Sequence, residues 1–557
     1  MKKLTILLFA ATALAAGCKK FTENINTNPN QPTVVTPNVL LSASLNSSAA
    51  NLALDFQNTA RWMGYWSRSG SYIEDVPTET YDIQPSYADG SWQSLYAVLT
   101  QYKGVEAAAG SDPFYSGVAK IMEALHFSTL VDGFNNVPYS QAFNLNKYPN
   151  PKYDDAATVY AALVQQCDSA VYYFQKAIVY YGTAPSTVVS TDNTYDIVYG
   201  RAALALSATQ RMDYWIKFAN TVKLKLLMTA RGSSASAFSA SSITTELAKV
   251  TATGQGYIGS DYAGGGIAYD VAANESASVN PGYGTANAAQ QNPFFGSFYV
   301  PSGTPNNNLA YYRANTYYVN YGNNFSDFRF TDDYLINLGG APYVTGNYDG
   351  DPNAVSNSLS SQLGQSTVPT TIGPLHSSAQ DEFLMSDFES LFWQAEAASL
   401  GYNVGTLTSG KLADIGTEQS FVYVDDTGSG SASQDAADAE TNFIAGTAGT
   451  IVDISTSTPT LRAIMTEKWS ALNSINWEQA YTDYRRTGYP VPDGTNFGFS
   501  HAQNRVTHSS KDALGNVQSV NLPYRYLYPQ SEINTNAGNI PAGTSAYTKI
   551  FWDNREQ

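Results

Sequence analysis

The sequence predicts a mostly α-helical protein, and three observations support that fold class. Several segments place apolar side chains at the spacing of one helix face. Most of them begin beside a residue that can cap a helix, and a glycine follows two of them. The apolar faces of such helices must be buried against one another. The segments show no measurable repeat period, so the pattern alone does not indicate a helical-repeat scaffold.

The clearest helix is predicted from Asp112 to Val131. Asp112 can cap it, and Pro113 suits the first position because the first N–H groups of a helix have no helical acceptor. Gly133 follows its end. The apolar face consists of Val118, Ile121, Met122, Leu125 and Leu130. The segment therefore has a start signal, a face to bury and a stop signal.

The same signals predict further helices along the chain. A helix from Asp155 to Ile178 has Asp154 at its cap position, and a helix from Asp381 to Leu400 is closed by Gly401. The other predicted helices run from about Asp213 to Thr229, from Ser241 to Val250, and from near Thr460 through Ile464, Lys468 and Leu472.

Two stretches interrupt this helical pattern. Residues 232–380 are rich in Gly, Asn, Ser and Tyr, and we expect loops, short strands and short helices there. Residues 401–449 form a polar insertion, and long loops on a helical body usually carry function or are disordered. We therefore expect one domain over 37–557, with a helical scaffold at about 37–231 and 381–557 and a loop-rich region at about 232–380.

The first residues predict export and lipid attachment. Two lysines precede the apolar stretch Leu4 to Leu14, which is too short to cross a bilayer core of about 30 Å. The following L-A-A-G-C resembles a bacterial lipobox. We therefore expect a signal peptide at 1–17, lipidation of Cys18 and a polar tether over 18–36. The alternative is an ordinary signal peptide with a chance cysteine.

Charge and composition restrict the partners. The formal net charge is −17, and cleavage would remove Lys2 and Lys3 to leave −19, which argues against nucleic acid or an anionic lipid surface. With Cys18 lipidated, only Cys167 remains, so no internal disulfide is expected. The chain holds 40 Tyr, 24 Phe and 8 Trp. Tyr and Trp combine an apolar face with a polar tip, which suits partly hydroxylated ligands.

The motifs that often mark cofactor or metal sites have structural interpretations here. The G-x-G-x-x-G at 254–259 follows a predicted helix, whereas a dinucleotide site needs a strand before the turn. The four histidines lack metal-ligand spacing, and His126 lies among apolar residues, as a core histidine would. Two acidic pairs do not match a calcium-binding EF-hand loop and are expected to be solvated turns: Asp349 with Asp351, and Asp425 with Asp426.

A glycoside hydrolase would need two facing carboxylates. Four candidates lie on predicted helices: Glu389, Glu396, Glu467 and Glu478. Ion pairing with Arg485 and Arg486 is the structural alternative. We expect no catalytic residue, no cofactor and no metal ligand, so the chain is predicted to be a binding protein and not an enzyme.

Two groups of aromatic residues are the candidate ligand platform. One group ends the first helical region, and the other, which includes Tyr311 and Tyr312, lies in the loop-rich region beside several asparagines. Aromatic residues in polar loops have less packing reason to exist than those on helix faces, although core burial is the alternative for each. The candidate ligand-binding residues are Trp62, Tyr65, Trp66, Tyr72, Tyr317, Tyr318 and Tyr321.

Several segments together resemble the SusD/RagB family of nutrient-binding outer-membrane lipoproteins, in its SusD-like branch. The most specific is I-M-T-E-K-W-S-A-L-N-S-I-N-W-E-Q-A-Y-T-D-Y-R-R-T-G-Y-P at 464–490, followed by R-Y-L-Y-P at 525–529. The others are N-I-N-T-N-P-N at 24–30, K-I-M-E-A-L-H-F-S-T-L-V-D-G-F-N-N-V-P-Y-S-Q-A-F at 120–143, P-K-Y-D at 151–154 and W-I-K-F-A-N at 215–220. They span nearly the whole chain in family order. Asn135-Asn136 departs from the pattern, because a Gly-Asp pair is common there.

The resemblance implies a tetratricopeptide-like helical-repeat scaffold with a loop-rich capping region. It also implies a lipid-anchored position on the outer membrane, exposed at the cell surface beside a SusC-like TonB-dependent transporter. In such a protein the aromatic residues would capture an oligosaccharide or a similar oligomer and pass it to the transporter. The alternatives are a surface glycoside hydrolase and a peptide-binding member of the same family.

Overall fold

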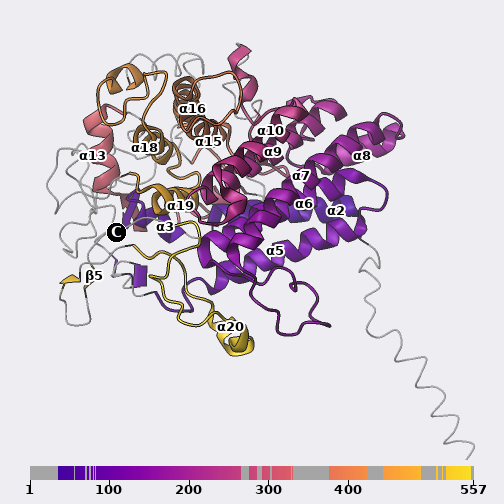
Figure 1. Cartoon of the computed structure of the whole chain (residues 1–557), viewed down its shortest axis with the longest axis horizontal. Coiled ribbons are helices and arrows are strands. Elements are labelled where there is room, and N and C mark those ends of the chain that lie inside the picture. Colours follow the sequence, from indigo (N-terminus) through magenta and orange to yellow (C-terminus); the bar gives the residue numbers. More distant parts are fainter. Residues whose placement is uncertain are drawn as a thin grey trace, which may run out of the picture.

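The computed structural model describes most of the chain, and the described part is mostly helical, as the sequence predicted. Figure 1 shows helices throughout, with only short strands. The described residues are 35–54, 57–68, 72–73, 77–78, 81, 83–264, 275–284, 291–301, 304–327, 329, 375–424, 443–490, 510–511, 517–518 and 522–553. Cys18 and the four aspartates of the two acidic pairs lie outside these residues.

The N-terminal helices form a layered array in chain order. Helix α2 packs on α5, α5 on α6, α6 on α7, and α7 on α9, and Figure 1 shows them side by side in indigo to magenta. Their bounds are Pro37–Leu54 for α2, Asp89–Ala108 for α5, Pro113–Phe134 for α6, Ala156–Tyr181 for α7 and Ala208–Ala230 for α9. The apolar face predicted for α6 is buried, because the helix has neighbours on several sides.

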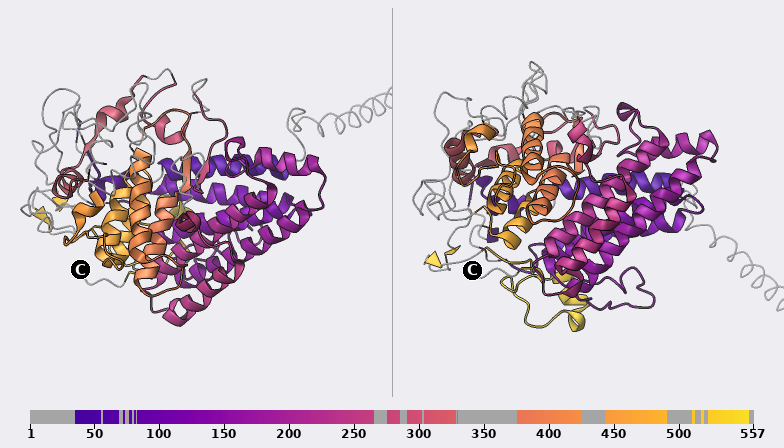
Figure 2. Two further views of the ribbon diagram at one scale, coloured as in Figure 1. Left: turned by 90° about the horizontal axis from the view of Figure 1, so that it is seen from above. Right: turned by 45° about the horizontal axis from the view of Figure 1, so that its top comes forward.

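The C-terminal helices form a second group that packs against α9. Helix α15 contacts α9, α16 and α18, while α19 contacts α9 and the short helix α3. Figure 2 shows these orange helices beside the N-terminal array. Their bounds are Asp387–Ser399 for α15, Ser409–Val424 for α16, Leu461–Ala471 for α18 and Trp477–Thr487 for α19, and the N-terminal α3 spans Gln57–Trp62.

Short elements fill the remaining described chain. The helices are α8 (Ser186–Tyr195), α10 (Ala240–Thr253), α11 (Pro293–Gly296), α12 (Asn307–Tyr311), α13 (Thr316–Phe325) and α20 (Gln530–Thr535). Single 3₁₀ turns lie at Ala202–Leu204, Ser236–Phe238, Ser260–Gly264, Ala445–Thr447 and Ala537–Asn539. The three antiparallel strand pairs are β1 (Trp66–Arg68) with β3 (Tyr312–Ala314), β2 (Ala277–Val279) with β4 (Glu382–Met385), and β5 (Ser510–Lys511) with β6 (Val517–Gln518).

Side-chain caps fix where several helices begin. The Asp112 carboxylate accepts a hydrogen bond from the Phe114 N–H at 2.9 Å, with Pro113 at the first position, as predicted. Thr460 caps α18 by accepting from the Ala463 N–H. A cap satisfies a helical N–H that no helical carbonyl can reach, so it fixes the first turn.

Three local predictions need correction. The cap of α7 is Asp155, whereas Asp154 accepts hydrogen bonds from the Tyr139 and Ser140 N–H groups and so ties down the preceding loop. The first residues of the segment 381–400 form strand β4, because they pair with β2, and α15 starts only after them. The polar insertion 401–449 contains the largely buried helix α16.

Two arginines from the segments that carry the family resemblance, Arg485 and Arg525, close the end of α6. The Arg485 guanidinium donates to the Asp132 carbonyl at 2.7 Å and to the Tyr524 carbonyl at 2.8 Å. Arg525 donates to the Phe134 carbonyl. The last carbonyls of a helix lack helical donors, so these two arginines satisfy them and hold the segment around 525 against α6. In the described part of the chain, no helix is long and apolar enough to cross a membrane.

Candidate ligand-binding site

Strands β1 and β3 bring the two predicted aromatic groups together. Trp66 pairs with Ala314 and Arg68 with Tyr312, in antiparallel register. The Asn315 N–H donates to the Tyr65 carbonyl at 2.9 Å, and the Asn315 side-chain amide donates to the Trp66 carbonyl at 3.3 Å. Two segments that lie about 250 residues apart in sequence therefore form one aromatic cluster.

Six of the seven predicted ligand-binding residues are buried, five of them in this cluster and Trp62 beside Tyr481 and Tyr526. Tyr65 stacks on Trp469 with ring centroids 5.2 Å apart. The rings of Tyr317, Tyr318 and Tyr321 meet Trp469 edge-on, at 5.3 to 5.4 Å. The exposed fraction is 2% for Trp62 and 0% for Tyr65, Trp66, Tyr317, Tyr318 and Tyr321. These six side chains are core residues in the structure.

Three of these aromatic residues also place their polar tips in hydrogen bonds inside the protein. The Tyr65 hydroxyl donates to the Trp469 carbonyl at 2.6 Å, and the Tyr321 hydroxyl donates to Glu467 at 2.6 Å. The Trp62 indole donates to the Thr78 carbonyl at 3.1 Å. A stacking platform needs an exposed ring face, so the structure corrects the expectation that these six residues present one to a ligand. They match the alternative stated for each of them, which was burial in the core.

Tyr72, the seventh predicted residue, lies at the surface of the cluster. Its ring meets that of Tyr311 edge-on, with centroids 5.1 Å apart, and both side chains are half-buried. Tyr311 in turn packs on Tyr312, and Tyr312 packs on Trp66 at 4.7 Å. A continuous series of rings therefore runs from the core to a half-exposed pair of tyrosines.

Arg61 supports the tyrosine pair from below. Its guanidinium donates to the Tyr311 hydroxyl at 3.1 Å and to the Thr78 hydroxyl at 3.1 Å. The same guanidinium lies 6.0 Å from the Tyr311 ring centroid. Arg61 itself is only 4% exposed. The Tyr311 ring is thus held by a buried charged group, and its orientation is fixed before any ligand arrives.

The four candidate carboxylates of a hydrolase lie inside the helical packing, and one of them, Glu467, borders the aromatic cluster. Both terminal nitrogens of the Arg486 guanidinium donate to the Glu396 carboxylate, at 2.5 and 2.6 Å. The Asp483 carboxylate forms ion pairs with the same arginine and with Lys468. Burial lowers the pKa of Lys468 to about 8. Glu478 lies 3.9 Å from Arg485. The ion pairing proposed as the structural role is therefore confirmed for Glu396 and Glu478.

The other two carboxylates are equally enclosed. Glu467 pairs with Arg329 at 3.0 Å, and burial raises the pKa of Glu467 to about 7 despite this arginine. Glu389 accepts hydrogen bonds from the Trp393 indole and the Asn476 side-chain amide. Both side chains are buried, and their hydrogen-bond partners are protein groups.

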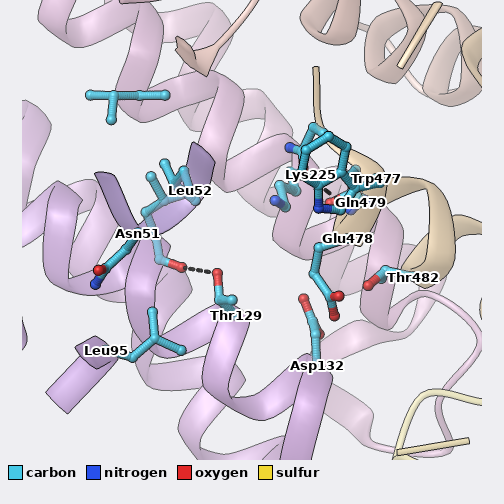
Figure 3. A pocket seen from close by; sticks show the side chains of 13 residues that line it. Asn51, Leu52, Leu95, Thr129, Asp132, Lys225, Trp477, Glu478, Gln479 and Thr482 are labelled. Atoms are coloured by element: carbon cyan, nitrogen blue, oxygen red, sulfur yellow. Dashed lines mark hydrogen bonds between the residues drawn. The ribbon is translucent and has the colours of Figure 1, made fainter. Parts of the chain in front are cut away.

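An internal cavity between α2, α5, α6, α9 and α19 is too small for an oligomeric ligand. Its volume is about 30 Å³, which suits one or two water-sized molecules. Figure 3 shows its lining, in which polar side chains such as Asp132, Lys225 and Glu478 face apolar ones such as Leu95. We therefore do not place the nutrient site there.

The remaining motifs have structural roles. His126 is fully buried, its Nε2 lies 2.7 Å from the Ser48 hydroxyl, and burial lowers its pKa to about 3, so it is a core histidine. Gly254 of the glycine-rich motif ends α10 at φ +80°, a conformation that suits glycine. Among the described residues, no group of three metal-ligating side chains comes together.

The family model SusD-like_2, described as starch-binding and associating with the outer membrane, matches residues 29–529. No curated protein sequence matches the chain. Solved structures with a similar fold include a SusD-like protein from Bacteroides thetaiotaomicron, which is 19% identical with a TM-score of 0.64 and coverage of 93% of this chain and 99% of that one. A chitin-binding SusD homolog from Flavobacterium johnsoniae is 19% identical, with a TM-score of 0.63 and coverage of 92% and 98%.

Proposed function

The chain belongs to the SusD-like family, and we propose that it captures an oligosaccharide or a similar oligomer at the cell surface and passes it to a SusC-like TonB-dependent transporter. SusD-like proteins are binding proteins associated with the outer membrane. The chitin-binding homolog supports a carbohydrate as the ligand class.

The Tyr72–Tyr311 pair is the proposed ligand contact, and it is the observation on which the proposal rests. The two rings form the half-exposed end of an otherwise buried aromatic series. Sugar rings offer apolar C–H faces that aromatic rings bind, while their hydroxyls need nearby donors and acceptors. Of the buried residues that we predicted as ligand contacts, Trp66 supports this pair through Tyr312.

The anchor completes the proposal. Cys18 of the L-A-A-G-C motif would carry the lipid, and residues 18–36 would tether the folded domain. A linker of that length would have a root-mean-square reach of roughly 20–25 Å, enough for a lid over the outer mouth of a barrel. A lid that survives purification should bury well over about 1,000 Å². A mild-detergent pull-down with a tag after Gln557 tests this step, and absence of a large barrel protein would contradict it.

Titration calorimetry with maltohexaose, chitohexaose, cellohexaose and mannohexaose tests the binding function. We expect at least one hexasaccharide to bind the wild-type chain and none to gain new reducing ends during incubation. Release of reducing ends by the pure protein would favour the hydrolase alternative. Binding of a peptide library without binding of any hexasaccharide would favour a peptide-binding member of the family.

A further inference from the structure

We propose that the groove between α5, the segment 138–151 and α20 is a second carbohydrate-binding site. The groove has a volume of about 700 Å³, within the range of roughly 300–1,000 Å³ that small-ligand sites occupy. It shares no lining residue with the Tyr72–Tyr311 pair. Figure 1 shows α20 beside the end of α5 and well below α13. The proposal rests on the proposed function, which supplies the ligand class.

Aromatic rings line the groove. Tyr96 and Phe143 are half-buried, with ring centroids 6.1 Å apart and planes tilted by 47°. Tyr96 packs on Trp92 at 5.0 Å, and Phe143 packs on Phe127 at 6.2 Å. The Tyr96 hydroxyl donates to the Pro138 carbonyl at 2.7 Å, which fixes the ring across the groove. Two rings at an angle can hold successive apolar faces of a short sugar chain.

The backbone at Phe143 is strained. Its φ is +63°, in the left-handed region that bulky side chains rarely adopt. Such strain persists only where the surroundings fix it, and it is found preferentially at binding sites. Here the surroundings are the Phe127 and Tyr96 rings, which hold the Phe143 ring in the groove wall.

The two walls of the groove are tied together by hydrogen bonds. The Asn150 side-chain amide donates to the Thr535 carbonyl at 2.6 Å, and the Asn536 amide donates to the Pro151 carbonyl at 2.9 Å. The Tyr153 hydroxyl donates to Glu532 Oε2 at 2.7 Å. The groove is therefore formed before a ligand arrives, which reduces the entropy lost on binding.

The rim offers polar groups of the kind that sugar hydroxyls need. Gln93, Asn144 and Asn146 are exposed around the groove, and Glu532 lies half-buried beside them. Amides donate and accept, and the second carboxylate oxygen of Glu532 is an acceptor. This combination of rings and amides favours a hydroxylated ligand. Leu145 on the same rim is 66% exposed. An apolar protein partner, the alternative to a sugar, would contact this side chain.

Calorimetry on variants of the full chain, with the same four hexasaccharides, separates the two sites. In the double variant Tyr72→Ala/Tyr311→Ala we expect a weaker class of binding to remain. Phe143→Gly removes the ring and relieves the positive φ. Added to the double variant, it should weaken the affinity of the remaining binding roughly two- to tenfold. Adding Gln93→Ala/Asn146→Ala should weaken it similarly. Tyr172→Ala, which removes a ring on α7 that is 55% exposed, is the matched control and should change nothing.

Three outcomes would overturn the second site. One is complete loss of binding in Tyr72→Ala/Tyr311→Ala with a native circular dichroism spectrum, which leaves the first site standing alone. Another is a residual class that the groove substitutions do not affect. A third is weakening by Leu145→Ala but not by Gln93→Ala/Asn146→Ala, which would assign the groove to an apolar partner. If no hexasaccharide binds the wild-type chain, both the second site and the proposed function fail.

Discussion

Tyr65 stacks on Trp469 with ring centroids 5.2 Å apart and planes 15° apart, although 404 residues separate them in sequence. Each also closes a hydrogen bond on the other segment, because the Tyr65 hydroxyl donates to the Trp469 carbonyl and the Trp469 indole donates to the Met63 carbonyl. The pair joins the N-terminal strand β1 region to α18. It is the centre on which the aromatic series leading to Tyr72 is built.

Replacing Trp469 with alanine should therefore destabilise the protein strongly. The substitution leaves a cavity among Tyr65, Tyr317, Tyr318 and Tyr321, and large-to-small changes of this kind typically cost about 3–5 kcal/mol. Urea unfolding should show this loss. Tyr172→Ala on the surface of α7 should stay within about 0.5 kcal/mol of wild type. Equal effects of the two substitutions would contradict the central role of Trp469.

The buried pair Glu396–Arg486 predicts a compensating double variant. Arg486→Met leaves the Glu396 carboxylate buried and without its bidentate partner, which should cost about 3–5 kcal/mol. Arg486→Met/Glu396→Leu removes both charges and leaves Lys468 paired with Asp483. The double variant should thus unfold at a higher urea concentration than the single one. Additive losses would show that the two side chains do not act as a pair.

His126 predicts a loss of stability in acid. Its folded pKa of about 3 lies below the unfolded value of about 6.5, so the unfolded state binds the extra proton between these values. The contribution of neutral His126 to the free energy of unfolding is fully present above the unfolded pKa of about 6.5. It falls by up to ~1.4 kcal/mol per pH unit as the pH drops toward 3. Buried carboxyls with raised pKa, such as Glu382 at about 8, act in the opposite direction.

Comparison with His126→Gln isolates the histidine from those carboxyls. The stability advantage of wild type over this variant should shrink by about 2 kcal/mol between pH 7.5 and pH 5. Unfolding curves at the two pH values give this difference directly. A constant difference would mean that His126 is not buried in its neutral form.

Replacement of Cys18 tests the anchor. Cys18→Ala should release the protein from the membrane fraction, because the lipid is the expected attachment of the mature chain. Cell fractionation with an antibody to the folded domain measures this. Cys167→Ala is the matched control, since that thiol is buried within the fold and should not affect the location. Unchanged membrane retention of Cys18→Ala would remove the lipidation hypothesis.

The elements that the sequence predicted well depend on neighbouring residues. Asp112, Pro113 and Thr460 mark helix starts because a cap acts within three residues of itself. The start of α9 was missed, although Ser207 and Gln210 form a capping box there, because the apolar pattern becomes clear only several residues later. Strand β4 was missed because its partner β2 lies about 100 residues earlier.

The sequence predicted which aromatic residues gather near the candidate site, but not which of them are exposed. Aromatic density identified both halves of the cluster, and β1–β3 pairing brings them together. Nothing local distinguishes the buried Tyr318 from the half-exposed Tyr72, because burial is decided by Trp469 and other residues far along the chain. The groove around Tyr96 and Phe143 was missed for the same reason, since its walls come from three separate segments.

The most direct test of the account is the affinity of Tyr72→Ala/Tyr311→Ala for a hexasaccharide that the wild-type chain binds. Each lost ring contact is worth about 0.5–1.5 kcal/mol. The double variant should therefore bind at this site roughly five- to a hundredfold more weakly, with a native circular dichroism spectrum. Titration calorimetry beside the Tyr172→Ala control gives the comparison. An affinity equal to that of wild type would contradict the placement of the ligand on the Tyr72–Tyr311 pair.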